Sequence, residues 1–142
     1  DYAFSDTRYE GVRPQVEFIN IDDHPFKVDD IEIDHLSLEH GMGRTTGYRF
    51  GSFAFATDFK RFQPWQIDRW KDKIDTMVLT GLRFRDHPSH STVEESIQLL
   101  QALNVRRGIL THLSHEISYV EDSKRLPKGV EFAYDGMIID VP

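Results

Sequence analysis

The chain has no cysteine among its 142 residues, which excludes a disulfide framework and every metal site built on thiolate ligands. It also lacks an apolar run long enough to cross a bilayer, and no signal-like pattern opens it. These absences favour a cytoplasmic protein with no membrane association. A length of 142 residues suits one domain that buries its own core.

Basic residues are the scarcer charged class, with 17 Lys and Arg against 24 Asp and Glu and a formal net charge of −7. A protein that grips long nucleic acid through the phosphate backbone usually presents a basic face. The composition therefore disfavours long nucleic acid as a partner and leaves room for a small anionic substrate. The first residue is Asp1 rather than Met. We expect the chain to be a processed product, a separate subunit or a piece of a longer protein.

The first half of the chain predicts antiparallel sheet. Residues 16–20, VEFIN, alternate apolar and polar side chains as a half-buried strand does. A hairpin follows, with Asp29 and Asp30 as the turn between two alternating runs. A second hairpin turns at Gly51 and Ser52.

The second half changes to helical and buried-strand patterns. Residues 64–74 have the helical period, and Pro64 is tolerated at a helix start. Residues 76–111 are typical of one βαβ unit with parallel strands, whose helix is capped by Ser91 or Thr92. The fold class is thus α/β with a mixed sheet.

Two short elements are expected near the end of the chain. The segment SHEISYVEDSK predicts a polar helix capped by Ser114. Residues 130–141 predict a closing hairpin, because Asp135-Gly136 is the strongest turn signal in the sequence.

Polar residues stand where several of these elements end or begin. His40, Asp58 and His112 follow strands, and His90 immediately precedes a capped helix. Ligands of α/β sheets bind outside the carboxyl ends of the strands, and a helix N-terminus favours phosphate. We therefore expect His90 and His112 on one rim.

Each of these residues also has an ordinary structural explanation, as a strand end, a turn or a helix cap. Only their expected convergence favours a metal site. Imidazole and carboxylate suit zinc or manganese, and paired metal ions assist phosphoryl transfer. The remaining histidines, His24, His35 and His87, are interpreted as structural.

The chain contains the succession LEHG, GYRFGSFAFATD, VLTGLRFRDHPSHSTVEES, ILTHLSHE and LPKGVEFAYDGMIIDV. This succession resembles the C-terminal half of metallo-β-lactamase-fold phosphodiesterases, in the branch of cyclic phosphate phosphodiesterases of phosphonate breakdown. The resemblance extends from about residue 1 to the end. It implies half of an αββα sandwich and, in the complete protein, two divalent ions, Zn or Mn.

The resemblance also implies roles for individual residues. His40, Asp58 and His112 match metal ligands, with Asp58 bridging the two ions. His90 matches a histidine that is not a ligand and that contacts the substrate or donates a proton. His115 matches a supporting position that hydrogen-bonds near the site.

Two departures from the family pattern matter. The HxHxDH motif, which supplies most of the other ligands, is absent from these 142 residues. Thr80 stands where the family has aspartate or asparagine, a position expected to shape the loop around the ligands. We therefore expect the chain to be the C-terminal part of such a domain, with its N-terminal half missing.

The sequence predicts a metal-dependent phosphodiesterase that acts on a small, cyclic phosphodiester. One alternative is a non-catalytic half-domain that docks to a partner subunit or to a second copy as a homodimer, because an uncovered sheet face calls for a partner. Another is a lactonase or thioesterase of the same superfamily.

Overall fold

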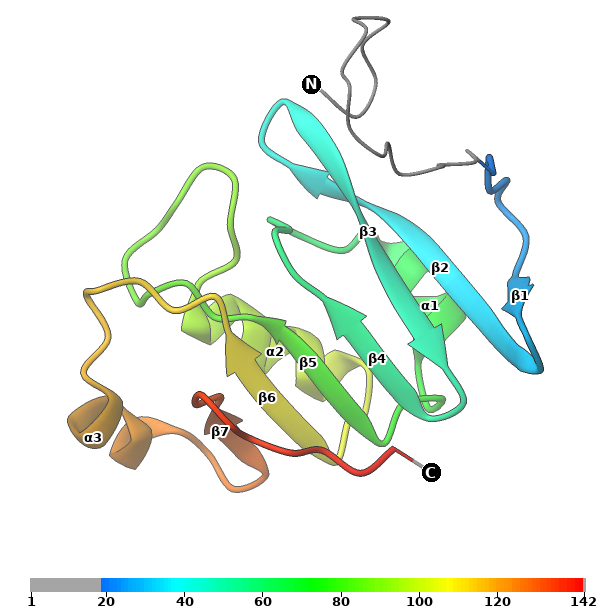
Figure 1. Cartoon of the computed structure of the whole chain (residues 1–142). Coiled ribbons are helices and arrows are strands. Elements are labelled where there is room, and N and C mark those ends of the chain that lie inside the picture. Colours follow the sequence, from blue (N-terminus) through cyan, green and yellow to red (C-terminus); the bar gives the residue numbers. More distant parts are fainter. Residues whose placement is uncertain (1–18, 142) are drawn as a thin grey trace, which may run out of the picture.

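The computed structural model describes residues 19–141, which form one mixed sheet with helices (Figure 1). The strands are β1 (Phe26–Val28), β2 (Ile31–His40), β3 (Gly43–Phe50), β4 (Phe53–Ala56), β5 (Thr76–Thr80), β6 (Arg107–Thr111) and β7 (Val130–Phe132). The helices are α1 (Pro64–Trp70), α2 (Val93–Ala102) and α3 (Tyr119–Asp122), and a 3₁₀ turn (Ser123–Arg125) follows α3. None of the helices in the described part of the chain is long and apolar enough to span a membrane.

The seven strands lie side by side in chain order. Strands β1 to β4 pair antiparallel, and β4 to β7 pair parallel. As a result β2, β4, β5, β6 and β7 all run in the same direction. Their carboxyl ends therefore meet at one edge of the sheet, which is the edge that carries the candidate site residues.

The hairpins predicted for the first half are confirmed. Phe26 pairs with Ile33 across the first turn, and Phe50 pairs with Phe53 across the second. Gly51 has a φ of 55°, the left-handed conformation that this turn requires. Of the strand predicted over 16–20, residues 16–18 lie outside the described range, and residues 19–20 form no strand.

The predicted βαβ unit is also confirmed, with β5 and β6 parallel on either side of α2. Thr92 is the N-cap: its side chain accepts the N–H of Glu95, and the Glu95 carboxylate accepts the N–H of Thr92. Helix α1 starts at Pro64 as predicted but ends at Trp70 rather than residue 74. The chain turns there because the N–H of Asp72 donates to the carbonyl of Leu103 instead of continuing the helix.

Two predictions near the C-terminus are wrong. Ser114 does not cap a helix; its N–H is taken by the carbonyl of Leu82, and α3 begins only after Ser118. The Asp135-Gly136 turn forms, but no return strand follows it, and β7 pairs with β6 in parallel. Met137 and Ile139 instead pack over the sheet, where apolar contacts replace the hydrogen bonds of a hairpin.

The two faces of the sheet are covered to different extents. Helices α1 and α2 lie on one face (Figure 1), and the main core there includes Leu38, Trp70 and Leu110, all fully buried. On the other face the C-terminal segment packs against a smaller cluster around Ile109. The antiparallel end of that face has no such cover from the described residues, and its Phe55 side chain is 41% exposed.

A buried carboxylate ties α1 to the antiparallel strands. Asp34 in β2 is 5% exposed and accepts hydrogen bonds from Trp70, Arg69 and Arg49. Burial alone would raise the pKa of Asp34, but the hydrogen bonds from Arg69 and Trp70 and the charge of Arg69 outweigh it, and the pKa lies below its usual value of 3.8. The charged form is therefore bound more favourably in the folded state.

The lowered pKa of Asp34 gives a stability prediction. Its contribution is complete above the ordinary carboxyl pKa and is lost as the pH falls through the lower folded value. We expect Asp34→Asn to cost about 1–3 kcal/mol at pH 7, and to flatten the decline in stability at acidic pH. Urea unfolding from pH 2 to 7 measures both effects. Asp68→Asn, on the exposed side of α1, is the matched control, and an equally steep decline in Asp34→Asn would contradict the assignment.

Candidate metal centre

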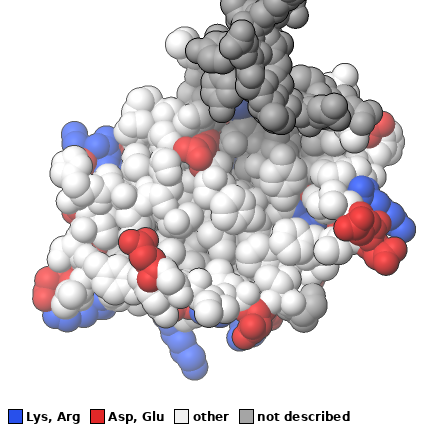
Figure 2. Space-filling model, viewed as in Figure 1, with Lys and Arg blue, Asp and Glu red and all other residues white. Residues whose placement is uncertain are grey.

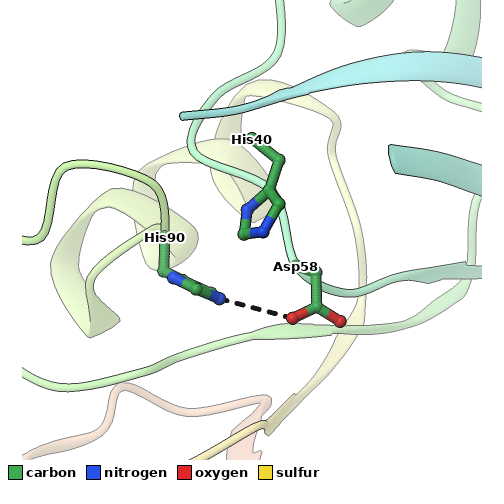
Figure 3. Close-up of side chains that lie close together, drawn as sticks. All are labelled: His40, Asp58 and His90. Atoms are coloured by element: carbon green, nitrogen blue, oxygen red, sulfur yellow. Dashed lines mark hydrogen bonds and ion pairs between the residues drawn. The ribbon is translucent and has the colours of Figure 1, made fainter. Parts of the chain in front are cut away.

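Three predicted residues from distant parts of the chain converge at the common strand edge (Figure 3). His40 is the last residue of β2, Asp58 follows β4, and His90 precedes α2. One nitrogen or carboxylate oxygen from each lies within 4.8 Å of the others, which makes them able to hold a metal ion. Nε2 of His90 is 3.3 Å from Oδ1 of Asp58.

His40 is oriented by a backbone hydrogen bond. Its Nδ1 lies 3.0 Å from the carbonyl oxygen of Ser89. Because a carbonyl oxygen only accepts, Nδ1 must carry the proton, and Nε2 of neutral His40 keeps its lone pair. A ring nitrogen that donates to a carbonyl while the other stays free is the usual arrangement of a metal-binding histidine.

His112 joins the same cluster from β6. Its Nε2 is 3.3 Å from Oδ1 of Asp58, the same oxygen that His90 approaches. The rings of His90 and His112 stack, with centroids 4.9 Å apart and planes 13° apart. The expectation that His90 and His112 share one rim is therefore confirmed. Asp58 lies at the centre, with both imidazoles directed at one oxygen.

The backbone is held in the left-handed region at two of these positions. The φ of Asp58 is 57° and that of His112 is 58°, values that cost free energy for residues other than glycine. The N–H of Asp58 donates to Oγ1 of Thr80 at 2.9 Å, and Thr80 is fully buried. Thr80 thus supports the turn that presents Asp58, consistent with a residue that shapes the loop.

The loop between β5 and α2, residues 81–92, is pinned to the strand edge by ion pairs. Lys60, with only 11% of its side chain exposed, binds both Asp86 and Glu95. Burial alone would lower the pKa of Lys60, but its hydrogen bonds to Asp86 and Glu95 raise it, so the lysine stays charged. The N–H of Ser91 also donates to the carbonyl of Phe59 at 2.7 Å. These bonds fix the segment that carries His90.

A second set of ion pairs joins that loop to the segment after β6. Glu116 accepts from Arg83 at 2.6 Å and from Arg85 at 3.0 Å. The N–H of Ser114 donates to the carbonyl of Leu82 beside them. The loops that present His90 and His112 are therefore bound to each other as well as to the sheet.

The protonation states suit a cation. Burial would raise the pKa of Asp58, but the charge of His112 and the hydrogen bond from His90 outweigh it and lower that pKa. Burial and the neighbouring histidines lower the pKa of His90 despite its contact with Asp58. An ionised Asp58 beside an imidazole of lowered pKa at His90 suits a divalent metal ion, whose ligands bind in their deprotonated form.

The geometry of the cluster is compatible with a shared ion. Two ligand atoms at tetrahedral positions about 2.1 Å from an ion lie about 3.4 Å apart. The 3.3 Å separations from Oδ1 of Asp58 to His90 and to His112 are close to this value. Nitrogen and oxygen donors of this kind suit zinc or manganese. Asp58 and His112 are 42% and 41% exposed, so solvent and substrate reach the cluster.

The structure places two further histidines differently from the sequence interpretation. His87, taken as structural, lies in the cluster, with its Nδ1 3.1 Å from Nδ1 of His90 and Ser89 Oγ next to both. Its three-residue spacing from His90 in DHPSH is the signal that could have identified it. His115 is exposed, and no hydrogen bond or ion pair connects it to the cluster among residues 19–141. Its supporting role stays a prediction.

At the N-terminus of α2, two of the N–H groups that were expected to favour phosphate are already bonded. The N–H of Val93 donates to the carbonyl of Arg83, and that of Glu95 is taken by Thr92. Glu94 and Glu95 add negative charge in the first turn. The helix cap thus stabilises the loop that carries His90.

The fold and the cluster together define an α/β protein with a candidate metal centre, and the comparisons identify its family. The family model described as the beta-lactamase superfamily domain matches residues 1–113. The chain therefore belongs to the beta-lactamase superfamily, as its resemblance implied.

Three known proteins show how far this similarity extends. A solved diphosphatase of the PhnP family matches with a TM-score of 0.85 and 29% identity over 90% of this chain and 50% of its own. The short form of human tRNase Z matches with a TM-score of 0.63 and 17% identity over 82% of this chain and 44% of its own. An octanoyltransferase of Porphyromonas gingivalis is 33% identical over 98% of this chain but only 29% of its own length. The chain thus spans half or less of each relative.

The bond between Asp58 and Thr80 predicts the effect of removing the hydroxyl. Thr80→Val keeps the shape but leaves the N–H of Asp58 without its acceptor, which should cost about 1–3 kcal/mol of unfolding free energy. We also expect weaker Zn²⁺ binding, because Asp58 loses its support. Thr80→Ser, which keeps the hydroxyl, is the control. Urea unfolding and calorimetric Zn²⁺ titration measure the two effects, and equal Zn²⁺ affinity in Thr80→Val and the wild type would refute the supporting role.

Proposed function

We propose that this protein is a metal-dependent phosphodiesterase that hydrolyses small, cyclic phosphodiesters. The observation that carries the proposal is the convergence of His40, His90 and His112 on Asp58 at an exposed strand edge. We propose His40, Asp58 and His112 as metal ligands. Asp58 would bridge two divalent ions, Zn or Mn, once the other ligands of the complete site are present.

The residues of this chain then have distinct tasks. Bound metal ions supply the charge that activates water and stabilises a phosphoryl group. His40 keeps Nε2 directed to the site because Ser89 holds its Nδ1. His90, 15% exposed beside Asp58, is placed to give a proton from Nε2 to the leaving oxygen of the ester. That oxygen leaves as an alcohol when the bond from phosphorus to it breaks.

The relatives support a phosphoryl substrate to different degrees. The solved protein with 29% identity is a diphosphatase. Its similarity is high enough in sequence as well as in fold to support a phosphoryl substrate for this chain. The tRNase Z likeness, at 17% identity, supports the fold alone. The match to the octanoyltransferase covers less than a third of that protein, so its activity does not carry over. Phosphodiester hydrolysis is the function that the site and the diphosphatase favour together.

The internally bonded N-terminus of α2 keeps a second reaction open. Because the N–H groups of Val93 and Glu95 are already bonded, His90 is the main feature that favours a phosphoryl over a carboxylic ester. A lactonase or thioesterase of the same superfamily would use the same metal ligands. Hydrolysis of a lactone or a thioester at a higher rate than a phosphodiester would select this alternative.

The proposed role of His90 predicts a specific loss. His90→Ala should lower metal-dependent hydrolysis of bis(p-nitrophenyl) phosphate by about a hundredfold, the usual contribution of a general acid, with metal content unchanged. The assay measures initial rates in the complete protein with Mn²⁺ or Zn²⁺, beside metal analysis. His24→Ala, at an exposed position, is the control. An unchanged rate would remove the role, and loss of metal would make His90 a ligand instead.

We also propose that these 142 residues are the C-terminal part of the catalytic domain and that a complement supplies the HxHxDH ligands. The chain covers 50% of the diphosphatase. The sheet face away from α1 and α2 also carries an apolar hollow of about 500 Å³, lined by Phe26, Val28, Ile33, Tyr48, Phe50, Phe53 and Phe55. Figure 2 shows this side of the molecule, and the charged side chains there lie mainly toward the margins of the view. A preceding segment, a partner subunit or a second copy would cover this face.

The complement proposal predicts that the 142-residue chain binds Zn²⁺ weakly and hydrolyses bis(p-nitrophenyl) phosphate slowly or not at all. Addition of a segment that carries HxHxDH should restore tight binding and turnover. Calorimetry and rate assays compare the two forms, and sedimentation reports whether the short chain forms a homodimer. Full activity of the 142-residue chain alone would contradict the proposal.

A further inference from the structure

A cavity of about 300 Å³ lies at the carboxyl ends of β6 and β7, next to the metal centre. Thr111, His112 and Leu113 line one side, and Ala133, Tyr134 and Asp135 line the other. His112 connects the cavity to the metal centre, because it lines the cavity and its Nε2 lies 3.3 Å from Oδ1 of Asp58. A molecule with its phosphoryl group bound at the metal centre would therefore have this cavity beside it.

The turn after β7 explains why Tyr134 and Asp135 lie there. The N–H of Met137 donates to the carbonyl of Tyr134 at 3.0 Å, and Gly136 has a φ of 87°. No hairpin follows, and Met137 packs instead on the apolar cluster that contains Ile109. The strongest turn signal in the sequence thus holds two polar residues at the cavity rather than joining two strands.

The chemistry of this lining is selective. The Tyr134 side chain is 57% exposed and offers a hydroxyl that both donates and accepts. The exposed Asp135 carboxylate accepts only. The lining contains no lysine or arginine. Such a cavity suits a hydroxyl-bearing group that is neutral or cationic, and it repels a second anionic group.

We propose that this cavity binds the alcohol part of the substrate ester, and that Tyr134 and Asp135 select a hydroxyl-bearing, uncharged or cationic group over an anionic one. This inference rests on the proposed function, because it assumes a phosphoryl group at Asp58. It adds the chemical class of the esterified group, which the metal ligands do not determine.

The test compares two phosphomonoesters that resemble reaction products. Glycerol 3-phosphate ends in a hydroxymethyl group, and 3-phosphoglycerate has a carboxylate at the same position. Both are titrated into the Zn²⁺-loaded protein and followed by ¹H–¹⁵N spectra, with inorganic phosphate as the probe for the phosphoryl site alone. We expect glycerol 3-phosphate to shift the amides of Tyr134 and Asp135, and to bind roughly fourfold more tightly than 3-phosphoglycerate, from the charge of Asp135 in water.

Two variants sharpen the comparison. Asp135→Lys should reverse the preference between the two ligands, and Tyr134→Phe should weaken glycerol 3-phosphate while leaving inorganic phosphate unchanged. Asp140→Lys makes the same charge change at an exposed position outside the cavity lining and should keep the wild-type preference.

The outcomes separate this inference from the proposed function. If all three ligands shift the amides of His90 and His112 but none shifts Tyr134 or Asp135, the cavity inference is overturned and the phosphoryl site stands. If no ligand shifts the histidine cluster, the proposed function fails and the inference fails with it. An unchanged preference in Asp135→Lys would overturn the selective role of Asp135.

Discussion

The hydrogen bond from the N–H of Asp58 to the Thr80 hydroxyl is the interaction on which the site depends. It holds Asp58 in the left-handed conformation that turns its carboxylate toward three histidines. Thr80 is itself fixed, because its carbonyl accepts from the buried hydroxyl of Ser96 in α2. A buried donor without an acceptor costs more than a hydrogen bond contributes. The helix, the strand β5 and the strained turn therefore form one connected unit.

The direction of the strands explains why so few residues are needed to build this centre. Strand β3 is the only member of the set from β2 to β7 that runs the opposite way. The antiparallel half consequently contributes His40 and Asp58 to the same edge at which the parallel half presents His90 and His112. A shift of one residue in the β2–β3 pairing would move His40 to the other face. The register of this pairing and the candidate metal centre are thus linked.

Much of this arrangement could be predicted from local patterns. The two hairpins and the capped helix α2 follow from turn residues and the capping box, which act over a few residues. The strand-end positions of His40, Asp58 and His112 follow from the same patterns. The presence of His87 in the cluster has only its three-residue spacing from His90 as a local signal, because its position also depends on how loop 81–92 folds over Lys60. The ion pair between Lys60 and Asp86 joins residues 26 positions apart, and a local sequence pattern cannot predict such a contact.

The two failed predictions near the C-terminus share a physical cause, which is competition from long-range contacts. Ser114 has the sequence of a helix cap, but Leu82 takes its N–H, and Arg83 and Arg85 hold Glu116. The Asp135-Gly136 turn has the sequence of a hairpin, yet Met137 and Ile139 after it cover apolar side chains of the sheet. At both positions the local turn forms, but the helix or strand that the sequence predicts directly after it does not. Both exceptions border His112, so the irregular segments of this chain gather where its chemistry is proposed to occur.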